Sequence, residues 1–437
     1  MIKRKFKVIS ICIVAIILIL EISKYILNSE TLNNNIFIYL LEYALISLIV
    51  IFNIKGRLFT IRNICVFVFS FMIGLSPLFY YLNNGTVISN QLNIIILSYL
   101  CFIIGIYISI PWKQKEKNTE KKYMIKLEDL AVIIGCIAIL ANIYYILTNR
   151  QNFFSNNLEN NRLDASSSNG LITLICGLIN PAIGLLFYKN LENKSKQYRI
   201  ILGLFIVFAV SSFLIQGSRT PILKLAIMFL LIYNIKKPIK NKAIIIVLIL
   251  GIVALISMQV LRMNRSNEDG DFTEVLLNTL QNGSINLNYV MNTFPEKVDF
   301  QYGYTYLINL IMMRPGPDLD FTLWLKDKVN IQFSGGGLTP TIIGEAYINF
   351  GFGGSLVICF LIGILINYLD WKYSVSKKNY FWISYFITIF IDSFRGGLAN
   401  IEIGLLTYLC LYIFIEKILG TKHKIKGEQY ENSDDRA

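Results

Sequence analysis

Long apolar runs constrain this chain more than any other feature of its sequence. Stretches of roughly 20 residues with almost no charge recur along its length. A helix of that length rises about 30 Å, which is the thickness of the hydrocarbon core of a bilayer. Only 16% of the residues are charged, whereas soluble domains are about a quarter charged. The sequence therefore predicts an all-α integral membrane protein.

Polar segments divide the apolar sequence into about 12 predicted transmembrane helices. The predicted spans are residues 8–27, 36–54, 64–82, 91–110, 130–147, 171–188, 200–215, 221–233, 243–261, 350–369, 381–394 and 403–418. No small-residue cleavage site follows the first run, so we expect an uncleaved first helix. An even number of spans places both termini on one side of the membrane.

The distribution of basic residues predicts the orientation. The chain carries a net charge of +13, but its basic residues lie between apolar runs instead of gathering on one surface, so no nucleic-acid partner is expected. Most of them fall in segments that are cytoplasmic if the N-terminus is inside. The positive-inside rule therefore predicts that both termini are cytoplasmic. The middle of the membrane is expected to be almost free of charge.

Metal and imidazole chemistry are not expected outside the membrane. The only histidine, His423, falls in the predicted cytoplasmic tail, and all seven cysteines lie within apolar runs without a Cys-x-x-Cys pattern. The sequence therefore indicates neither a metal site nor a disulfide framework, and we expect no cofactor.

The predicted loops are unequal in length, which defines the domain organisation. We expect spans 1–9 in residues 1–261, a large extracytoplasmic loop at 262–339, spans 10–12 in 340–420 and a cytoplasmic tail at 421–437. Two sets of apolar residues in the loop have helical spacing and predict short amphipathic helices against the outer leaflet. These sets are Phe272, Val275, Leu276 and Leu280, and Tyr304, Leu307, Ile308, Ile311 and Met312.

Arginine is concentrated on the predicted outer side. The outer arginines are Arg150, Arg162, Arg219, Arg262, Arg265, Arg314 and Arg395. Two of them lie in short turns beside glycine, Gly217-Ser218-Arg219 and Arg395-Gly396-Gly397, between unusually short spans. The guanidinium group binds phosphate oxygens in a bidentate manner, and adjacent glycines let an anion approach the backbone. Extension of each arginine toward the lipid headgroups is the alternative interpretation.

Carboxylates on the same side are candidates for acid–base chemistry. Glu345 comes about one turn before span 10, so we expect its carboxylate to face the outer interface, where it could act as a general base toward a sugar hydroxyl. Asp392 and Asp318 are the next candidates. An ion pair between Glu345 and an outer arginine is the other interpretation. Asp318-Leu319-Asp320 has the form of a metal-binding DxD, which we interpret as coincidence.

Several of these segments together resemble the Wzy-type O-antigen and capsular repeat-unit polymerases. The similarity covers the whole topology, with a large late outer loop. The matching segments are Gly217-Ser218-Arg219, Arg314-Pro315-Gly316-Pro317, Thr339-Pro340, Gly344-Glu345-Ala346-Tyr347, Asn349-Phe350-Gly351 and Arg395-Gly396-Gly397. Each segment is weak by itself, and the combination carries the resemblance.

The resemblance implies a GT-C-like membrane glycosyltransferase that works without a metal on undecaprenyl-pyrophosphate-linked glycans outside the bacterial cytoplasmic membrane. A growing glycan would move from its lipid pyrophosphate to a sugar hydroxyl of a second lipid-linked unit. It implies Arg219, Arg314 and Arg395 as pyrophosphate ligands and Glu345 as the residue at the acceptor hydroxyl. Further substrate contacts would come from Arg162, Arg262, Arg265, Asp318, Asp392 and Tyr347. A chain-length regulator and a flippase would be its protein partners.

Two other functions stay open at the level of sequence. A flippase that exports the lipid-linked unit would place charged residues along a cavity through the bilayer, and the predicted gathering of polar residues at one face disfavours it. A ligase that transfers finished glycan to another acceptor would use nearly the same arginines.

Overall fold

The computed structural model describes residues 10, 13–21, 24, 35–54, 58–112, 121–153, 170–218, 220–244, 246, 272–311, 320–331, 337–375 and 380–422. Up to residue 236 the described helical elements are α3 (Ile36–Asn53), α4 (Ile61–Phe69), η1 (Ser70–Gly74), α5 (Ser76–Asn84), α6 (Ser89–Tyr107), α7 (Leu127–Thr148), α8 (Arg150–Phe153), α10 (Gly170–Gly177), α11 (Ile179–Asn193), α12 (Lys196–Ile215) and α13 (Thr220–Lys236). The later ones are α15 (Phe272–Met291), η2 (Tyr304–Leu307), α16 (Ile308–Ile311), α17 (Phe321–Val329), α18 (Thr341–Val375), α19 (Tyr380–Phe390), α20 (Ser393–Gly396), η4 (Ala399–Ile401), α21 (Glu402–Ile413) and η5 (Phe414–Ile418).

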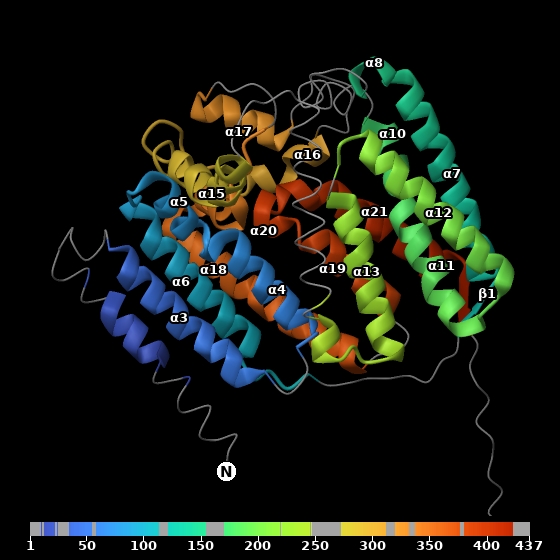
Figure 1. Cartoon of the computed structure of the whole chain (residues 1–437), viewed down its shortest axis with the longest axis horizontal. Coiled ribbons are helices and arrows are strands. Elements are labelled where there is room, and N and C mark those ends of the chain that lie inside the picture. The colour runs from blue at the N-terminus through green and yellow to red at the C-terminus, as the bar shows by residue number, and fades with distance from the viewer. Residues whose placement is uncertain are drawn as a thin grey trace, which may run out of the picture.

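The helices form two groups with a third between them (Figure 1). α3, α4, α5, α6 and α18 pack on one side, and α7, α10, α11 and α12 on the other. α13, α19 and α21 lie between these groups, and α15, α16 and α17 cover one end of the bundle. The helices follow from the apolar runs, because a helix satisfies its own backbone polar groups in a lipid environment.

Seven stretches of the described residues are long and apolar enough to cross a membrane. They are Ile36–Asn53, Ile61–Asn84, Ser89–Tyr107, Leu127–Thr148, Leu171–Asn193, Lys196–Ile215 and Thr341–Val375. The prediction of a helical integral membrane protein is therefore confirmed. α13, α19 and α21 coincide with predicted spans but contain only 17, 11 and 12 residues. Predicted span 8–27 is described only in part, and predicted span 243–261 lies largely outside the described residues, so the number twelve stays a prediction.

The described residues also include a short β-ribbon, which leaves the predicted all-α class unchanged. Antiparallel strands β1 (Lys121–Tyr123) and β2 (Gly420–Lys422) pair Tyr123 with Gly420. The Tyr123 hydroxyl donates to Glu416 Oε1 at 3.1 Å, and Trp382 Nε1 donates to the same oxygen at 2.8 Å. These two polar segments were predicted to lie on one side of the membrane, and pairing satisfies their backbone groups. The folded part of the chain thus extends into the predicted tail.

A close helix crossing holds the first group together. α6 and α18 meet at Gly105 and Gly363, where the Cα atom of Gly363 would lie 3.0 Å from a Cβ atom placed on Gly105. Small residues let helix backbones approach in a membrane, where lipid removes the hydrophobic drive for association. Beside the crossing, the rings of Phe69 and Phe102 stack with centroids 4.6 Å apart. This contact fixes α18, which carries the candidate site.

α18 is broken where it meets the loop helices. Gly351 has φ 66° and ψ −161°, which divides the element into half-helices 341–350 and 352–375. The Ser355 hydroxyl donates to the Ile343 carbonyl oxygen at 3.1 Å. Residues so far apart along a straight helix could not bond, because each residue adds about 1.5 Å. The first half-helix therefore folds back against the second.

The described part of the long loop packs as a small subdomain on the bundle. Its buried core consists of Val290, Phe294, Ile308, Phe321, Leu325 and Leu338, joined by Ile348 of α18 and Ala399 of η4. α15 also crosses α5, where the Ser284 backbone N–H donates to Ser76 Oγ at 2.6 Å. The predicted helices at 304–311 and in α15 are present. They pack against other parts of the protein through one face, and part of their surface is exposed.

A buried ionic cluster lies near the predicted outer ends of the first two spans. Lys24 Nζ lies 2.7 Å from carboxylate oxygens of both Glu21 and Glu42. Glu42 is fully buried on α3, and Lys24 is only 5% exposed. Pairing offsets part of the large cost of removing these charges from water.

The glycine crossing yields a stability prediction. Gly105→Val should lower the thermal midpoint of the detergent-solubilised protein, because the added side chain meets the backbone of α18, and such overpacking costs about 1–3 kcal/mol. Gly203→Val on α12 is the matched control, since a Cβ atom there has nothing within 4 Å. Midpoints can be read from the monodisperse fraction that survives heating. Equal midpoints for the two variants would contradict the packing argument.

Candidate functional site

Glu345 lies where the first half of α18, the loop and the turn after α20 converge. Its carboxylate accepts hydrogen bonds from the backbone N–H groups of Leu398 and Ala399, the latter at 3.1 Å from Oε1. The Thr305 hydroxyl donates to Oε1 at 3.1 Å. Glu345 is 0% exposed. The expectation that this carboxylate faces the outer interface is therefore wrong, because backbone amides and one hydroxyl enclose it.

The turn that Glu345 holds requires glycine at its centre. Gly397 has φ 83°, a left-handed conformation that costs L-residues energy. A Cβ atom at this position would also collide with the Glu345 carboxylate. The turn Arg395-Gly396-Gly397, predicted as an anion-binding turn, is thus shaped to receive a carboxylate from within the protein.

Asn349 secures the end of the half-helix that carries Glu345. Its amide donates to Thr305 Oγ1 at 2.6 Å and to the Glu345 carbonyl oxygen at 2.9 Å. Its Oδ1 atom accepts from Gly303 N at 2.8 Å. Backbone N–H groups of Gln301 and Tyr302 cap the carbonyl oxygens of residues 348 and 349. The broken helix end is therefore satisfied by the loop.

A second carboxylate ties the loop to the same turn. Glu402 Oε2 accepts from Leu310 N at 3.0 Å. Asn309 donates from Nδ2 to the Ala399 carbonyl oxygen at 2.6 Å and accepts from Phe321 N at 3.0 Å. Both acids at this junction thus bind backbone amides. Glu402, Asn309 and Thr305 were not predicted as site residues. Glu402 and Asn309 bond backbone groups, which carry no sequence signature, and Thr305 lies far from Glu345 and Asn349 in the sequence.

Tyr306 shows the electrostatic character of the junction. It lies in η2 beside Glu345 and Asn349, and its ring contacts Phe350 with centroids 6.4 Å apart. Burial, and then the nearby Glu345 carboxylate, raises the pKa of its hydroxyl well above the ordinary value. The hydroxyl therefore stays protonated at neutral pH.

The two arginine turns are brought together by an ion pair. Lys224, on the first turns of α13, pairs with Asp392, which precedes α20. Arg395 is exposed and interacts electrostatically with Asp392. The turn at 216–218, which leads into α13, and the turn at 392–397 therefore belong to one region. Lys224 was not predicted as a site residue, although a lysine so early in an apolar helix beside Arg219 was a usable signal.

The other predicted site residues are placed as follows. Arg162, Arg219, Arg262, Arg265, Arg314 and Asp318 lie outside the described residues. Tyr347 is half-buried and packs its ring edge-on against Phe300, with centroids 6.1 Å apart. Asp320 caps α17 by accepting from Thr322 N at 2.8 Å. Among the described residues no group of three or more His, Cys, Asp or Glu could hold a metal.

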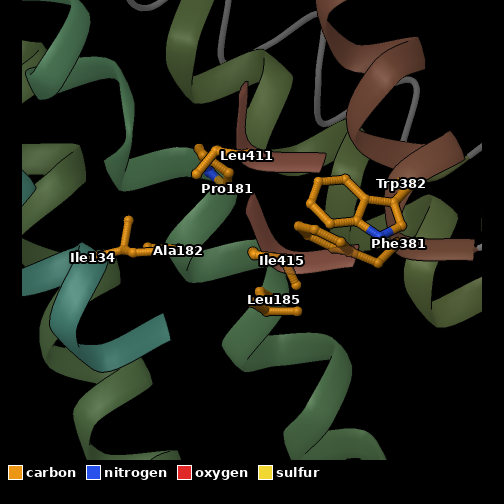
Figure 2. Close-up of a pocket in the computed structure, with 8 residues that line it drawn as sticks. All are labelled: Ile134, Pro181, Ala182, Leu185, Phe381, Trp382, Leu411 and Ile415. Atoms are coloured by element: carbon orange, nitrogen blue, oxygen red, sulfur yellow. The ribbon is translucent and has the colours of Figure 1, made fainter. Parts of the chain in front are cut away.

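A small apolar pocket lies apart from this junction (Figure 2). It opens between α7, α11, α19, α21 and η5. Its lining is Ile134, Pro181, Ala182, Leu185, Phe381, Trp382, Leu411 and Ile415. The side chains that face it offer no charged group, so it does not suit an anionic ligand. The arginine turns remain the candidate site.

The fold and the site define a multi-pass membrane protein with a polar junction at one end of its helical bundle. The family described as O-antigen polysaccharide polymerase Wzy matches residues 8–422. The chain therefore belongs to this family. No curated protein and no solved structure matches it significantly.

The ion pair yields a prediction for the family's activity. Asp392→Asn should leave Lys224 and Arg395 without the carboxylate between them, and we expect polymer to fall about tenfold, equivalent to ~1.4 kcal/mol. Polymer can be measured by gel analysis of surface glycan at matched protein levels. Glu192→Gln is the control, because it breaks an exposed ion pair with Lys189 on α11. Normal polymer from Asp392→Asn would show that the pair has no part in the site.

Proposed function

We propose that this protein joins undecaprenyl-pyrophosphate-linked oligosaccharide repeat units on the outer face of the bacterial cytoplasmic membrane. The bond between the donor's anomeric carbon and its phosphate oxygen breaks. A glycosidic bond to a hydroxyl of the next lipid-linked unit forms, the hydroxyl proton passes to solvent water, and the lipid pyrophosphate leaves. Family membership supports polymerisation, and the geometry of the two turns supports where it occurs.

The Lys224–Asp392 ion pair is the observation that carries this proposal. It joins the element that begins directly after Arg219 to the turn that presents Arg395. Charge develops on the departing pyrophosphate in the transition state, and preorganised cations stabilise such charge strongly where water is scarce. Arg219, Arg314 and Arg395 are the proposed pyrophosphate ligands, so we expect no metal to be required. Arg162, Arg262 and Arg265 stay predicted glycan or phosphate contacts, and Asp318, Asp392 and Tyr347 stay predicted substrate contacts.

The buried Lys24–Glu42 pair bears on the alternative of a flippase. A flippase needs charged groups along a path through the bilayer. Glu42 is fully enclosed by protein and paired, so it does not line such a path. The described polar network lies instead at the loop end of the bundle, which favours chemistry at one membrane face.

Deletion of the gene should reduce the ladder of surface glycan to a single repeat unit, because unpolymerised units can still be transferred to their final acceptor. The banding pattern on a gel measures this. Accumulation of lipid-linked units that face the cytoplasm would instead indicate a flippase. Complete loss of capped acceptor would indicate a ligase.

Arg395→Lys and Arg219→Lys should each abolish long polymer, because lysine keeps the charge but loses the bidentate fork. Chain-length distributions at matched protein levels measure the effect. Arg199→Lys on α12 is the control, since Arg199 is exposed outside the junction. Wild-type chain lengths in both test variants would refute the pyrophosphate role.

A further inference from the structure

We propose that Glu345 is a positioning residue that clamps the Arg395 turn, with Thr305 and Asn349 holding the clamp in place. This inference rests on the proposed function for Arg395. The sequence predicts Glu345 as a general base. The structure instead points to a role in shaping the site of the Arg395 cation.

The occupancy of the carboxylate excludes direct contact with an acceptor hydroxyl in this conformation. Both oxygens accept hydrogen bonds, from Leu398 and Ala399 backbone amides and from the Thr305 hydroxyl. A general base must reach its proton directly or through one water. Glu345 is fully buried, so neither route leads to its oxygens.

The bonds fix the part of the chain that matters for Arg395. The bound amides lie three and four residues after the arginine, and Gly397, directly before them, adopts its left-handed conformation against the carboxylate. Because the backbone just after Arg395 is held by these bonds, it limits where the guanidinium can extend. Two aligned N–H groups that would attract an anion are occupied by an internal one, so the substrate anion is left to the arginine.

Thr305 and Asn349 connect this clamp to the loop. Thr305 donates to Glu345 and accepts from Asn349, which also bonds the Glu345 carbonyl oxygen and Gly303 N. The Asn349 side chain thus joins the half-helix to the loop, and it reaches the Glu345 carboxylate through the Thr305 hydroxyl. Thr305→Val replaces the hydroxyl with a methyl group of similar size. It should loosen the clamp while the Glu345 carboxylate is kept.

A labelling experiment tests the clamp without relying on activity. Ala399→Cys introduces a thiol at a position that is fully buried, and a membrane-impermeant maleimide reports its exposure. We expect labelling to be at least tenfold faster when Glu345→Gln is combined with it, and several-fold faster with Thr305→Val. Glu128→Gln is the matched control, because Glu128 is a buried carboxylate that accepts from Asn193 between α7 and α11. It should leave the thiol protected.

The pH dependence of polymerisation separates positioning from catalysis. With purified protein and lipid-linked repeat units extracted from the deletion strain, Glu345→Gln should lower kcat at least tenfold while keeping the wild-type pH profile. Glu345→Asp should recover part of the rate, because a shorter carboxylate still accepts both amides. Gel filtration of each variant checks that a loss of rate is not a loss of fold. Thr305→Val is included as the milder change.

A protected thiol in Glu345→Gln, together with loss of one limb of the pH profile, would overturn the proposal and make Glu345 the base. Unchanged rates in both Glu345→Gln and Thr305→Val would overturn it as well. If wild-type protein makes no polymer from the extracted units, the proposed function fails, whereas the labelling result still decides whether Glu345 clamps the turn.

Discussion

Backbone polar groups that are not paired within a helix must be satisfied by protein, because lipid cannot satisfy them. This constraint governs the break in α18 at Gly351. The carbonyl oxygens of residues 348 and 349 accept hydrogen bonds from the backbone N–H groups of Gln301 and Tyr302. The Asn349 side chain accepts another from Gly303 N. The turn after α20 is also irregular, and its backbone N–H groups at Leu398 and Ala399 donate hydrogen bonds to Glu345. The loop subdomain is therefore part of what makes two irregular segments possible at the end of the bundle.

Charges in the molecule follow the same logic of local satisfaction. Lys24 is enclosed between Glu21 and Glu42, and Arg62 pairs with Asp370, whose other oxygen accepts from the first backbone N–H of α4. Lys224 and Asp392 are less enclosed than the Lys24 cluster, with side chains 28% and 19% exposed. The Arg62–Asp370 pair is also partly exposed, at 34% and 9%. Position therefore distinguishes the Lys224–Asp392 pair, because it joins the element that begins after Arg219 to the turn that contains Arg395.

The sequence predicted the parts of the structure that depend on local pattern. Apolar runs located most helices, short runs marked α13, α19 and α21, and glycines beside Arg395 marked a tight turn. The enclosure of Glu345 could not be predicted, because its partners are backbone amides of Leu398 and Ala399, and an amide has the same identity in every residue. The start of span 10 at residue 350 agrees with the break at Gly351. The half-helix before the break was not predicted, because the groups that stabilise it come from the distant loop.

These differences change how the motif residues divide the work. Gly344-Glu345-Ala346-Tyr347 and Asn349-Phe350-Gly351 appeared as a chemical motif, yet every described polar contact of Glu345 and Asn349 is internal. Their polar groups build the frame, and the exposed guanidinium of Arg395 is the group that it presents. A diphosphate leaving group needs fixed positive charge more than it needs a strong base. Negative charge accumulates on its oxygens as the bond between the anomeric carbon and the phosphate oxygen breaks. A site with the Glu345 carboxylate enclosed and arginine at its surface therefore suits that transfer, and the partly exposed Asp392 carboxylate is paired with Lys224.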